Sequence, residues 1–468
     1  MRGKMAATAL REHWSSRFAF LMAAIGSAVG LGNIWRFPFI AGENGGGAFV
    51  LIYLVTTALI ALPILIAEIM VGRMGGQSPV NSIYSLVRTH NKSKLWVWMG
   101  IGGTVGAFIV LSYYSVIGGW ALNYTTIALG TGFDGLTGES SGALFSGMIS
   151  APVSLMLWHT LFMGINIIIV MGGLHKGIER AVVFLMPLLF LLLLFMVSHA
   201  IGTEGFSAAW TFLFEPDFSK VTSKTYLVAI GQGFFSVSIA LGAMMMYGSY
   251  LDKSTSIPQS AVIIAIADTA VALLAGLAIF PLVFTFNLAP AEGPGLVFVT
   301  VPIAFGEMEN GYLLGVAFFL LLSVAAITSA ISLLAPAVAW AEEKYGATRR
   351  KIALIIGGGA WVLGIASVLS FSDWSEFYPL GFFGLYEGKT IFDTFDFSVT
   401  SFVQPMVGIM MALFVGWSLS REVVLDALNI TEGENRVLWV SVWLILLRFL
   451  VPIAIVGIFV RALWPNLL

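Results

Sequence analysis

Residues 25–33 read Ile-Gly-Ser-Ala-Val-Gly-Leu-Gly-Asn and lie in the middle of the first long apolar segment of the chain. The glycines weaken a helix interior, and the small polar side chains beside them offer the backbone other hydrogen-bonding partners. Residues 231–242 read Gly-Gln-Gly-Phe-Phe-Ser-Val-Ser-Ile-Ala-Leu-Gly and repeat this pattern five apolar segments later. The two stretches predict two helices that unwind near their centres.

Interrupted helices in matching positions of two halves are typical of transporters built from inverted repeats. In such proteins, free carbonyl groups bind cations and helix N-termini bind carboxylates. The alternative is that glycine and serine only permit close packing between helices. Close packing does not require the five-segment spacing, nor Asn33 and Gln232 beside the glycines. We therefore predict that the two broken helices form one binding region.

The composition places the chain in a membrane. Of the 468 residues, 58% are hydrophobic and only 10% are charged. The apolar segments run to about twenty residues, the length of a helical span, and lipid cannot satisfy exposed backbone polar groups. We predict an all-α polytopic membrane protein. The net charge of −2 gives no signal for nucleic-acid binding, and the absence of cysteine excludes disulfides and thiolate metal sites.

Hydropathy predicts eleven spans, at residues 17–42, 47–73, 95–129, 152–171, 177–200, 227–252, 257–288, 311–345, 352–371, 394–420 and 436–464. Of the 23 lysine and arginine residues, 17 fall in the N-terminal tail or in loops on the same side. The positive-inside rule makes that side cytoplasmic and, with eleven spans, puts the C-terminus outside. We expect the external loops 201–226 and 289–310 to pack against the bundle as lids. For the first loop, the alternative that it is only a passive connector is equally compatible with the sequence.

Motifs along the whole chain resemble one family. They are residues 11–14 (Arg-Glu-His-Trp), 28–38 (Ala-Val-Gly-Leu-Gly-Asn-Ile-Trp-Arg-Phe-Pro), 43–49 (Glu-Asn-Gly-Gly-Gly-Ala-Phe), 113–114 (Tyr-Tyr), 231–235 and 328–329 (Thr-Ser). On these residues the sequence resembles the neurotransmitter:sodium symporters, in particular the bacterial leucine transporter and its eleven-span bacterial relatives. The resemblance implies a symporter of the bacterial inner membrane that couples sodium entry to uptake of a small hydrophobic amino acid, aliphatic or aromatic.

The resemblance also implies a fold of two inverted five-helix repeats with unwound helices 1 and 6, plus a peripheral eleventh span. The corresponding parts are a cytoplasmic tail (1–16), a first repeat (17–200), an external loop (201–226), a second repeat (227–420), and a cytoplasmic loop with span 11 (421–468). The sequence does not determine the oligomeric state, the sodium stoichiometry or which amino acid is carried.

Sodium is a hard cation that prefers oxygen ligands, and the resemblance implies two sodium sites. The first comprises Ala28, Asn33, Ser236 and Asp268, together with the substrate carboxylate. The second comprises Gly26, Val29, Ala325, Thr328 and Ser329. A sodium ion that touches the substrate binds better in its presence, and the effect is reciprocal. For the two hydroxyls of the second site, the alternative is a hydrogen bond to the preceding helical turn.

The substrate-binding residues implied by the resemblance are Ser27, Ala28, Leu31, Gly32, Val110, Tyr114, Phe235, Ser236, Ser238, Leu241, Ser329 and Leu333. The largely apolar lining predicts a hydrophobic substrate, because a charged side chain would lose its hydration without gaining a partner. The sequence departs from the leucine transporter at several contacts, where Ser27 stands for Asn, Ser236 for Thr, Ala240 for Gly and Leu241 for Phe. The choice between aliphatic and aromatic substrates therefore stays open.

Glu68 and Asp268 are the acids that we place deep within spans, where charge is costly. In the family, the position of Glu68 hydrogen-bonds the unwound backbone. Asp268 stands where chloride-dependent relatives have asparagine, and Ala272 stands where they have serine. We therefore expect Asp268 to replace chloride and to ligate the first sodium ion. A second hypothesis is that Asp268 takes up a proton once sodium leaves, because desolvation favours the neutral acid.

The resemblance implies an outer and an inner gate that close in turn. The residues of the outer gate are Arg36, Asp396, Gln232, Tyr114 and Phe235. Those of the inner gate are Arg11, Glu343, Trp14 and Tyr250. The first two residues of each set are expected to form an ion pair. The alternatives are an interfacial anchor for Arg36 and an ordinary cytoplasmic tail charge for Arg11.

Three other classes of protein fit the sequence less well. A proton-coupled permease of the same architecture typically has a basic group in the second cation site, whereas residues 325–329 read Ala-Ala-Ile-Thr-Ser. A channel needs rings of pore-lining residues, and the sequence has none. A membrane enzyme needs a nucleophile with its base or a metal cluster, but the histidines (13, 90, 159, 175 and 199) show no ligand spacing.

Overall fold

The fold is given by a computed structural model, which describes residues 12–288, 295–430 and 436–464. Within these ranges the chain is helical and has no strands, as the sequence predicts. Nine helices of the described part are long and apolar enough to cross a membrane, and a tenth span is a bent helix pair. The remaining predicted span, the sixth, consists of two shorter helices separated by a break.

The bent pair is the first predicted span. Helix α1 (Arg17–Ala28) ends at the glycine-rich stretch, and the chain resumes as a π-helical turn η1 (Gly32–Arg36) that runs into α2 (Phe37–Glu43). The two parts meet at an angle of 51°. The predicted break in span 1 is therefore present.

The sixth span is broken more widely, between α11 (Ser223–Ser236) and α12 (Ala243–Ser249). In the segment between them, Ser238, Ala240 and Gly242 have positive φ angles of 52°, 66° and 79°. Only glycine adopts this conformation without strain, so two of the three residues hold an unfavourable backbone. Contacts described below keep the segment in place.

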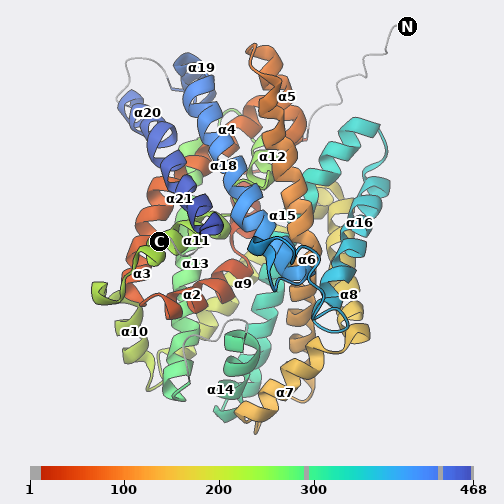
Figure 1. The fold of residues 1–468 in the computed structure, drawn as a ribbon, viewed down its shortest axis with the longest axis vertical. Coiled ribbons are helices and arrows are strands. Elements are labelled where there is room, and N and C mark those ends of the chain that lie inside the picture. Colours follow the sequence, from red (N-terminus) through yellow and green to blue (C-terminus); the bar gives the residue numbers. More distant parts are fainter. Residues whose placement is uncertain (1–11, 289–294, 431–435, 465–468) are drawn as a thin grey trace.

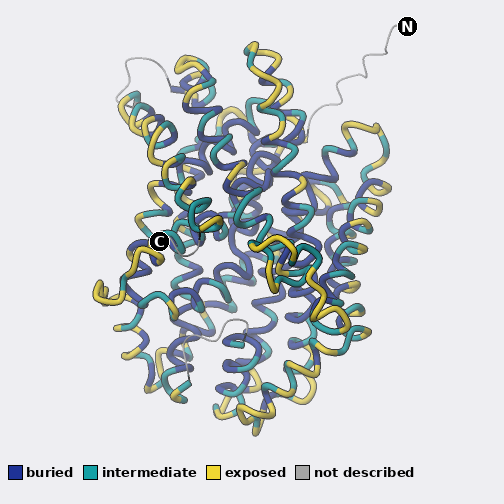
Figure 2. Tube along the Cα trace, viewed as in Figure 1, coloured by how far each residue is buried: buried dark blue, intermediate teal, exposed yellow. Residues whose placement is uncertain are grey.

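The other spans follow the predicted ranges closely. They are α3 to α4 (Gly47–Gly75), η3 with α6 (Lys94–Gly130), α8 (Pro152–Met171), η4 with α9 (Leu174–Ala200), α13 (Ile257–Thr285), α15 (Gly311–Tyr345), α16 (Arg349–Leu369), α17 to η9 (Ile391–Ser418) and α20 to α21 (Arg436–Leu463). Of the long spans, α15 is the most deeply buried, and Figure 2 shows the exposed residues gathered at the periphery and the two ends. Span 8 thus forms part of the core, beside α1 and α6.

Several connecting segments contain helices that hydropathy does not detect. Helices α5 (Pro79–Thr89) and α19 (Arg421–Ala427) lie at the end of the molecule where the described chain begins, and α7 (Gly138–Ile149) lies at the other end (Figure 1). These helices are too short or too polar to span a membrane, so the search for long apolar segments passes over them.

The two loops expected to pack as lids are structured. The first contains α10 (Phe206–Phe214), which packs on α13, and the ring of Phe212 lies 4.9 Å from that of Phe280. The second contains η6 (Leu296–Thr300) and α14 (Val301–Glu307), while residues 289–294 lie outside the described part. The first loop is therefore packed against the bundle rather than a passive connector.

Candidate substrate and ion sites

A cluster of four buried polar side chains joins the two breaks to neighbouring spans. Ser236 is the last residue of α11 and donates a hydrogen bond to the Asp268 carboxylate at 2.7 Å. The Asn33 amide group, just after the break in span 1, donates to the same carboxylate at 2.7 Å and to Ser236 at 3.0 Å. Tyr53 of α3 reaches the carboxylate at 3.4 Å. All four residues are at most 1% exposed.

This cluster brings together three of the four residues expected for the first sodium site. Its only full negative charge is the carboxylate of Asp268. The hydroxyls of Ser236 and Tyr53 supply neutral oxygens beside it, while Asn33 presents its N–H groups to the carboxylate. The amide oxygen of Asn33 accepts a hydrogen bond from the Gly30 N–H at 3.0 Å, which holds the side chain across the break. The donor set therefore fits a hard monovalent cation.

The two hydroxyl groups expected in the second sodium site have different hydrogen-bond partners. Ser329 of α15 lies across from the break in span 1, and its hydroxyl is 3.1 Å from the carbonyl oxygen of Val29 and 3.4 Å from that of Gly26. Thr328 instead donates to carbonyl groups of its own helix, Val324 and Ala325. The alternative expected from the sequence, a hydrogen bond to the preceding helical turn, is therefore found for Thr328. Ser329 instead links span 8 to span 1.

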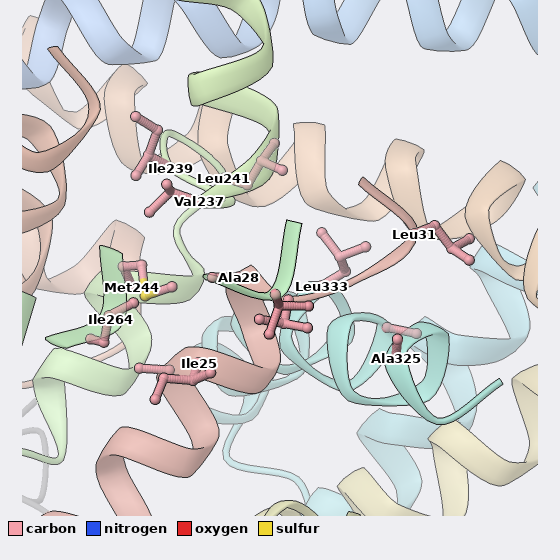
Figure 3. Packing of buried hydrophobic residues seen from close by; sticks show 14 of the residues in the cluster. Ile25, Ala28, Leu31, Val237, Ile239, Leu241, Met244, Ile264, Ala325 and Leu333 are labelled. Atoms are coloured by element: carbon pink, nitrogen blue, oxygen red, sulfur yellow. The ribbon is translucent and has the colours of Figure 1, made fainter. Parts of the chain in front are cut away.

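A small cavity of about 30 Å³ lies beside these groups. Its lining residues are Ala28, Gly30, Gly32, Val110, Tyr114, Phe235, Ser238, Leu241, Ser329 and Leu333. Figure 3 shows three of them, Ala28, Leu241 and Leu333, among the buried side chains around the breaks. A cavity of this volume holds about one or two water molecules, so an amino acid fits only if the walls move apart.

Most of the expected substrate-binding residues line this cavity. Three that do not are Ser27, Leu31 and Ser236. Leu31 still contributes its backbone N–H, which donates to the Tyr114 hydroxyl at 3.3 Å, and the carbonyl of Ser27 accepts from Ser238 at 2.9 Å. Gly30 lines the cavity although it was not expected there, because a residue without a side chain gives no sign of which wall it forms.

Two glycines of the break are required by close contacts. A Cβ atom on Gly30 would lie 2.4 Å from the Ser329 hydroxyl, and one on Gly32 would lie 2.9 Å from the Phe235 ring. Such separations are shorter than side chains tolerate. The small cavity therefore depends on bare backbone from span 1.

The strained segment of span 6 is held by side chains from other spans. The Glu68 carboxylate of α4 accepts a hydrogen bond from the Ala240 N–H at 2.5 Å, which confirms the expected contact with unwound backbone. Gln404 of α18 (Gln404–Leu413) donates to the carbonyl groups of Phe234 and Ile239. Gln404 was missed by the sequence reasoning, although an amide inside an apolar span is itself a signal.

The expected outer gate is only partly assembled. The Gln232 amide donates to the Gly32 carbonyl at 3.1 Å, joining spans 6 and 1. Arg36 and Asp396 do not form an ion pair in this structure. Asp396 instead accepts a hydrogen bond from Tyr113 at 2.9 Å, and the Arg36 guanidinium lies 4.2 Å from the centre of the Phe235 ring.

At the N-terminal end, Trp14 is inserted against α12. Its indole N–H donates to the Tyr247 carbonyl at 3.0 Å, its backbone N–H donates to the Tyr250 carbonyl, and it is only 5% exposed. Glu343 accepts hydrogen bonds from the Ser78 N–H at 2.8 Å and the Asn81 amide at 2.7 Å. The expected partner of Glu343, Arg11, lies outside the described residues.

Comparisons with known proteins agree with this geometry. A sequence model of the sodium:neurotransmitter symporter family matches residues 11–134 and 140–465. The chain is 36% identical over 448 residues to an uncharacterized sodium-dependent transporter of Bacillus subtilis (strain 168), covering 96% of this chain and 97% of that one. A similar transporter of Haemophilus influenzae is 33% identical over 461 residues, covering 97% and 98% of the two chains.

The fold is likewise similar to a solved structure. The crystal structure of MhsT in complex with L-phenylalanine superposes with a TM-score of 0.88 at 41% identity, covering 97% of this chain and 100% of that one. Both the sequence match and the fold therefore extend along nearly the whole chain. It belongs to the sodium:neurotransmitter symporter family and is a multi-pass sodium-dependent transporter rather than an enzyme.

Proposed function

We propose that this transporter imports a small hydrophobic L-amino acid, aliphatic or aromatic, together with two sodium ions and without chloride. The N-terminus lies in the cytoplasm, the C-terminus lies outside, and residues 17–200 and 227–420 form two inverted five-helix repeats. The observation that carries the proposal is the contact of Asn33 and Ser236 with the buried carboxylate of Asp268, between the two helix breaks.

The absence of a chloride requirement is supported by the position of that carboxylate. Asp268 provides a fixed negative charge among neutral oxygen donors, with no basic side chain hydrogen-bonded to it in the described chain. A buried charge without a counter-charge is unfavourable. A sodium ion between Asp268, Asn33, Ser236 and the Ala28 carbonyl neutralises it, so a second anion is not needed.

The second sodium ion is assigned to the contact between spans 1 and 8. The Ser329 hydroxyl already lies within hydrogen-bonding distance of span 1 carbonyl oxygens, and an ion there joins the two spans through the same atoms. Rotation of the Thr328 hydroxyl away from its own helix adds a further ligand. Occupation of this site favours the arrangement in which span 1 is held against span 8.

The hydrophobic substrate is supported by the small cavity. Val110, Phe235, Leu241 and Leu333 form its apolar side, and the hydroxyl groups that line it carry no charge. A charged substrate side chain would lose its hydration there without a partner. The similar transporter MhsT was crystallised with L-phenylalanine, which is consistent with an apolar substrate.

Alternating access then needs two gates. On the outside, Arg36 moves from Phe235 to Asp396, while Gln232, Phe235 and Tyr114 close over the substrate. On the inside, Trp14 and Tyr250 hold the tail against α12, and Arg11 pairs with Glu343.

The test uses the purified chain in proteoliposomes. Counterflow is measured for a panel of amino acids with sodium, potassium or choline outside, and then with chloride replaced by gluconate. We expect uptake of hydrophobic amino acids in sodium only, at an unchanged rate in gluconate. Uptake driven by a proton gradient without sodium would instead support a proton-coupled permease, and a strict chloride requirement would remove the assigned role of Asp268.

A further inference from the structure

An arginine lies inside the last membrane span. Span 11 consists of α20 (Arg436–Ile445), the π-helical turn η10 (Leu446–Leu450) and α21 (Val451–Leu463), and Arg448 falls in η10. A charged side chain within an apolar span is costly and therefore marks a candidate functional site. The substrate site, the sodium sites and the gates do not include Arg448, so its surroundings must show what it does.

Arg448 lies beside the end of span 10. Its Nε–H donates to the Gly416 carbonyl at 2.5 Å, and its own carbonyl accepts from the Trp417 indole N–H at 3.3 Å. Gly416 and Trp417 belong to η9 (Phe414–Ser418), the last turn of span 10, where carbonyl groups have no partner within the helix. These contacts occupy only the Nε atom of the side chain. Within the described chain, the two terminal nitrogens of the guanidinium have no hydrogen-bond acceptor.

The guanidinium of Arg448 lies at the outer surface of the bundle. Its central carbon is 5.6 Å from the centre of the Trp417 ring, and Trp417 is 59% exposed. Of the long spans of the described chain, span 11 is the least buried, and Figure 1 shows α20 and α21 at the edge of the molecule. Exposed apolar side chains continue along this span, at Leu438, Val442, Ile445 and Phe449. Around Arg448, the surface of span 11 is therefore one that faces lipid.

A second arginine lies on the same face of span 11. Arg421, the first residue of α19, donates to the Ser441 hydroxyl at 3.2 Å. Ser441 precedes Arg448 by seven residues, or about two helical turns, so the two positions share a face and lie about 10 Å apart along the axis. Neither arginine forms an ion pair within the described chain. We call the surface formed by Arg421, Ser441, Arg448 and Trp417 the arginine face.

The depth of the arginine face selects its ligand. Gly416 and Trp417 directly precede Ser418, where span 10 ends, so Arg448 lies level with a boundary of the membrane. The anions available at that depth are the phosphates of lipid headgroups, which fit the paired N–H donors of a guanidinium. Tryptophan is typical of the same boundary, because it combines an apolar ring with a polar N–H.

We propose that the arginine face binds an anionic phospholipid. The phosphate lies between Arg448 and Arg421 and above the Trp417 ring, and the acyl chains run along the exposed apolar residues of span 11. The bound lipid thereby joins span 11 to the end of span 10. Under the proposed orientation this site faces the cytoplasmic leaflet, because α19 lies at the end of the molecule where the described chain begins (Figure 1). Binding itself does not depend on the proposed function.

Binding is measured by native mass spectrometry on the full chain, delipidated in detergent, with phosphatidylglycerol or phosphatidylcholine carrying the same acyl chains. We expect phosphatidylglycerol to bind about tenfold more tightly, because each basic residue near a membrane surface favours anionic over zwitterionic lipid. Glycerol phosphate has the anionic group without acyl chains and should not displace the lipid. Equal binding of the two lipids would overturn the proposal, and so would displacement by glycerol phosphate, which would indicate a site for soluble anions.

The variants separate the arginine face from general positive charge. Arg448→Met should weaken phosphatidylglycerol binding by about tenfold, because hydrogen bonds to charged groups contribute strongly. Arg421→Met should weaken it by about fivefold. Arg350→Met is the matched control, since Arg350 is also exposed but lies at the start of α16, on the other side of the molecule in Figure 1. An equal loss in the control would show that any exposed arginine suffices and would contradict the proposal.

Arg421→Met decides the question if Arg448→Met does not fold, because Arg421 is exposed at the surface. Phosphatidylglycerol binding by Arg421→Met that equals the wild type would then overturn the proposal.

Thermal unfolding gives a second readout. Phosphatidylglycerol should raise the midpoint of thermal unfolding of the wild type more than that of Arg421→Met, since the lipid joins two spans only where both arginines hold it. An equal rise in the two proteins would contradict the proposal. Neither readout requires uptake, so a chain that binds phosphatidylglycerol but does not transport refutes only the proposed function.

Discussion

The hydroxyl oxygen of Ser329 lies 3.1 Å from the carbonyl oxygen of Val29, although the two residues are 300 positions apart in the chain. The contact joins the most buried span to the break in the first one. The neighbouring residue, Thr328, makes no such contact, because its hydroxyl donates hydrogen bonds to carbonyl groups of its own helix. The two adjacent hydroxyls should therefore contribute differently to sodium binding.

Ser329→Ala should lower the apparent affinity for sodium by about tenfold, because loss of one buried oxygen partner costs about 1–3 kcal/mol. The measurement is the sodium dependence of uptake at saturating substrate. Ser332→Ala is the control, since the Ser332 hydroxyl donates only to the Ser329 carbonyl of the same helix. An equal shift in both variants would mean that the effect is not specific to the contact with span 1.

Asp268→Asn should abolish uptake in sodium gluconate, because the buried cluster then lacks its negative charge. Adding Ala272→Ser to Asp268→Asn should restore uptake in sodium chloride but not in gluconate, since this pair recreates the residues of chloride-dependent relatives. Uptake of a radiolabelled substrate in the two salts measures this. If Asp268→Asn alone transports as well as the wild type in gluconate, the charge of Asp268 is dispensable.

Glu68→Ala should destabilise the protein by about 1–3 kcal/mol, because the Ala240 N–H is left without its acceptor in a strained segment. Glu68→Gln keeps an oxygen acceptor in place and should be less destabilising. The midpoint of thermal unfolding in detergent compares the two variants with the wild type. If both variants unfold at the same temperature, the hydrogen bond is not the source of the stability.

Gly32→Ala should abolish or strongly reduce transport, because its Cβ would lie 2.9 Å from the Phe235 ring. Gly231→Ala is the matched control, since a Cβ there would meet no atom within 4 Å apart from its chain neighbours and the nearby backbone of its own helix. Both changes add one methyl group beside a helix break. Comparable transport by the two variants would show that the close approach to Phe235 is not required.

Trp14→Ala should open the N-terminal end of the bundle, because its hydrogen bond to Tyr247 and its ring contacts are lost. The chain has no cysteine, so Ser249→Cys provides a single reporter that is only 4% exposed. Its reaction with a membrane-impermeant maleimide in inside-out vesicles should be faster with Trp14→Ala. The control Trp98→Ala, in which the changed side chain is 62% exposed, should leave the rate unchanged.

Much of the fold follows from local sequence. The spans were predicted because each is a long apolar segment, and α8 and α15 begin and end at the predicted residues. The breaks were predicted because glycine and serine lie where a helix would otherwise continue. Helices α5, α7 and α19 could not be found in this way, since they are not apolar enough to need lipid.

The candidate site could be predicted only in part from the sequence. The residue types around Asp268 indicated oxygen ligands, and the family resemblance indicated which residues meet. Gln404 was missed because it lies far from both glycine-rich stretches, and it reaches the Phe234 and Ile239 carbonyls only after span 10 packs on span 6. The expected ion pair between Arg36 and Asp396 is not formed, because Arg36 lies over Phe235 in this arrangement of the helices.

The sequence by itself determined that the chain crosses a membrane as helices and that two of them unwind, because these properties depend on the hydrophobicity and conformational freedom of neighbouring residues. Only the tertiary structure decided which polar groups meet. Asn33 and Asp268 are 235 positions apart, and their 2.7 Å contact exists because spans 1 and 7 pack together. In lipid, a polar group freed by a helix break must find its partner on another helix, so packing rather than local sequence selects that partner.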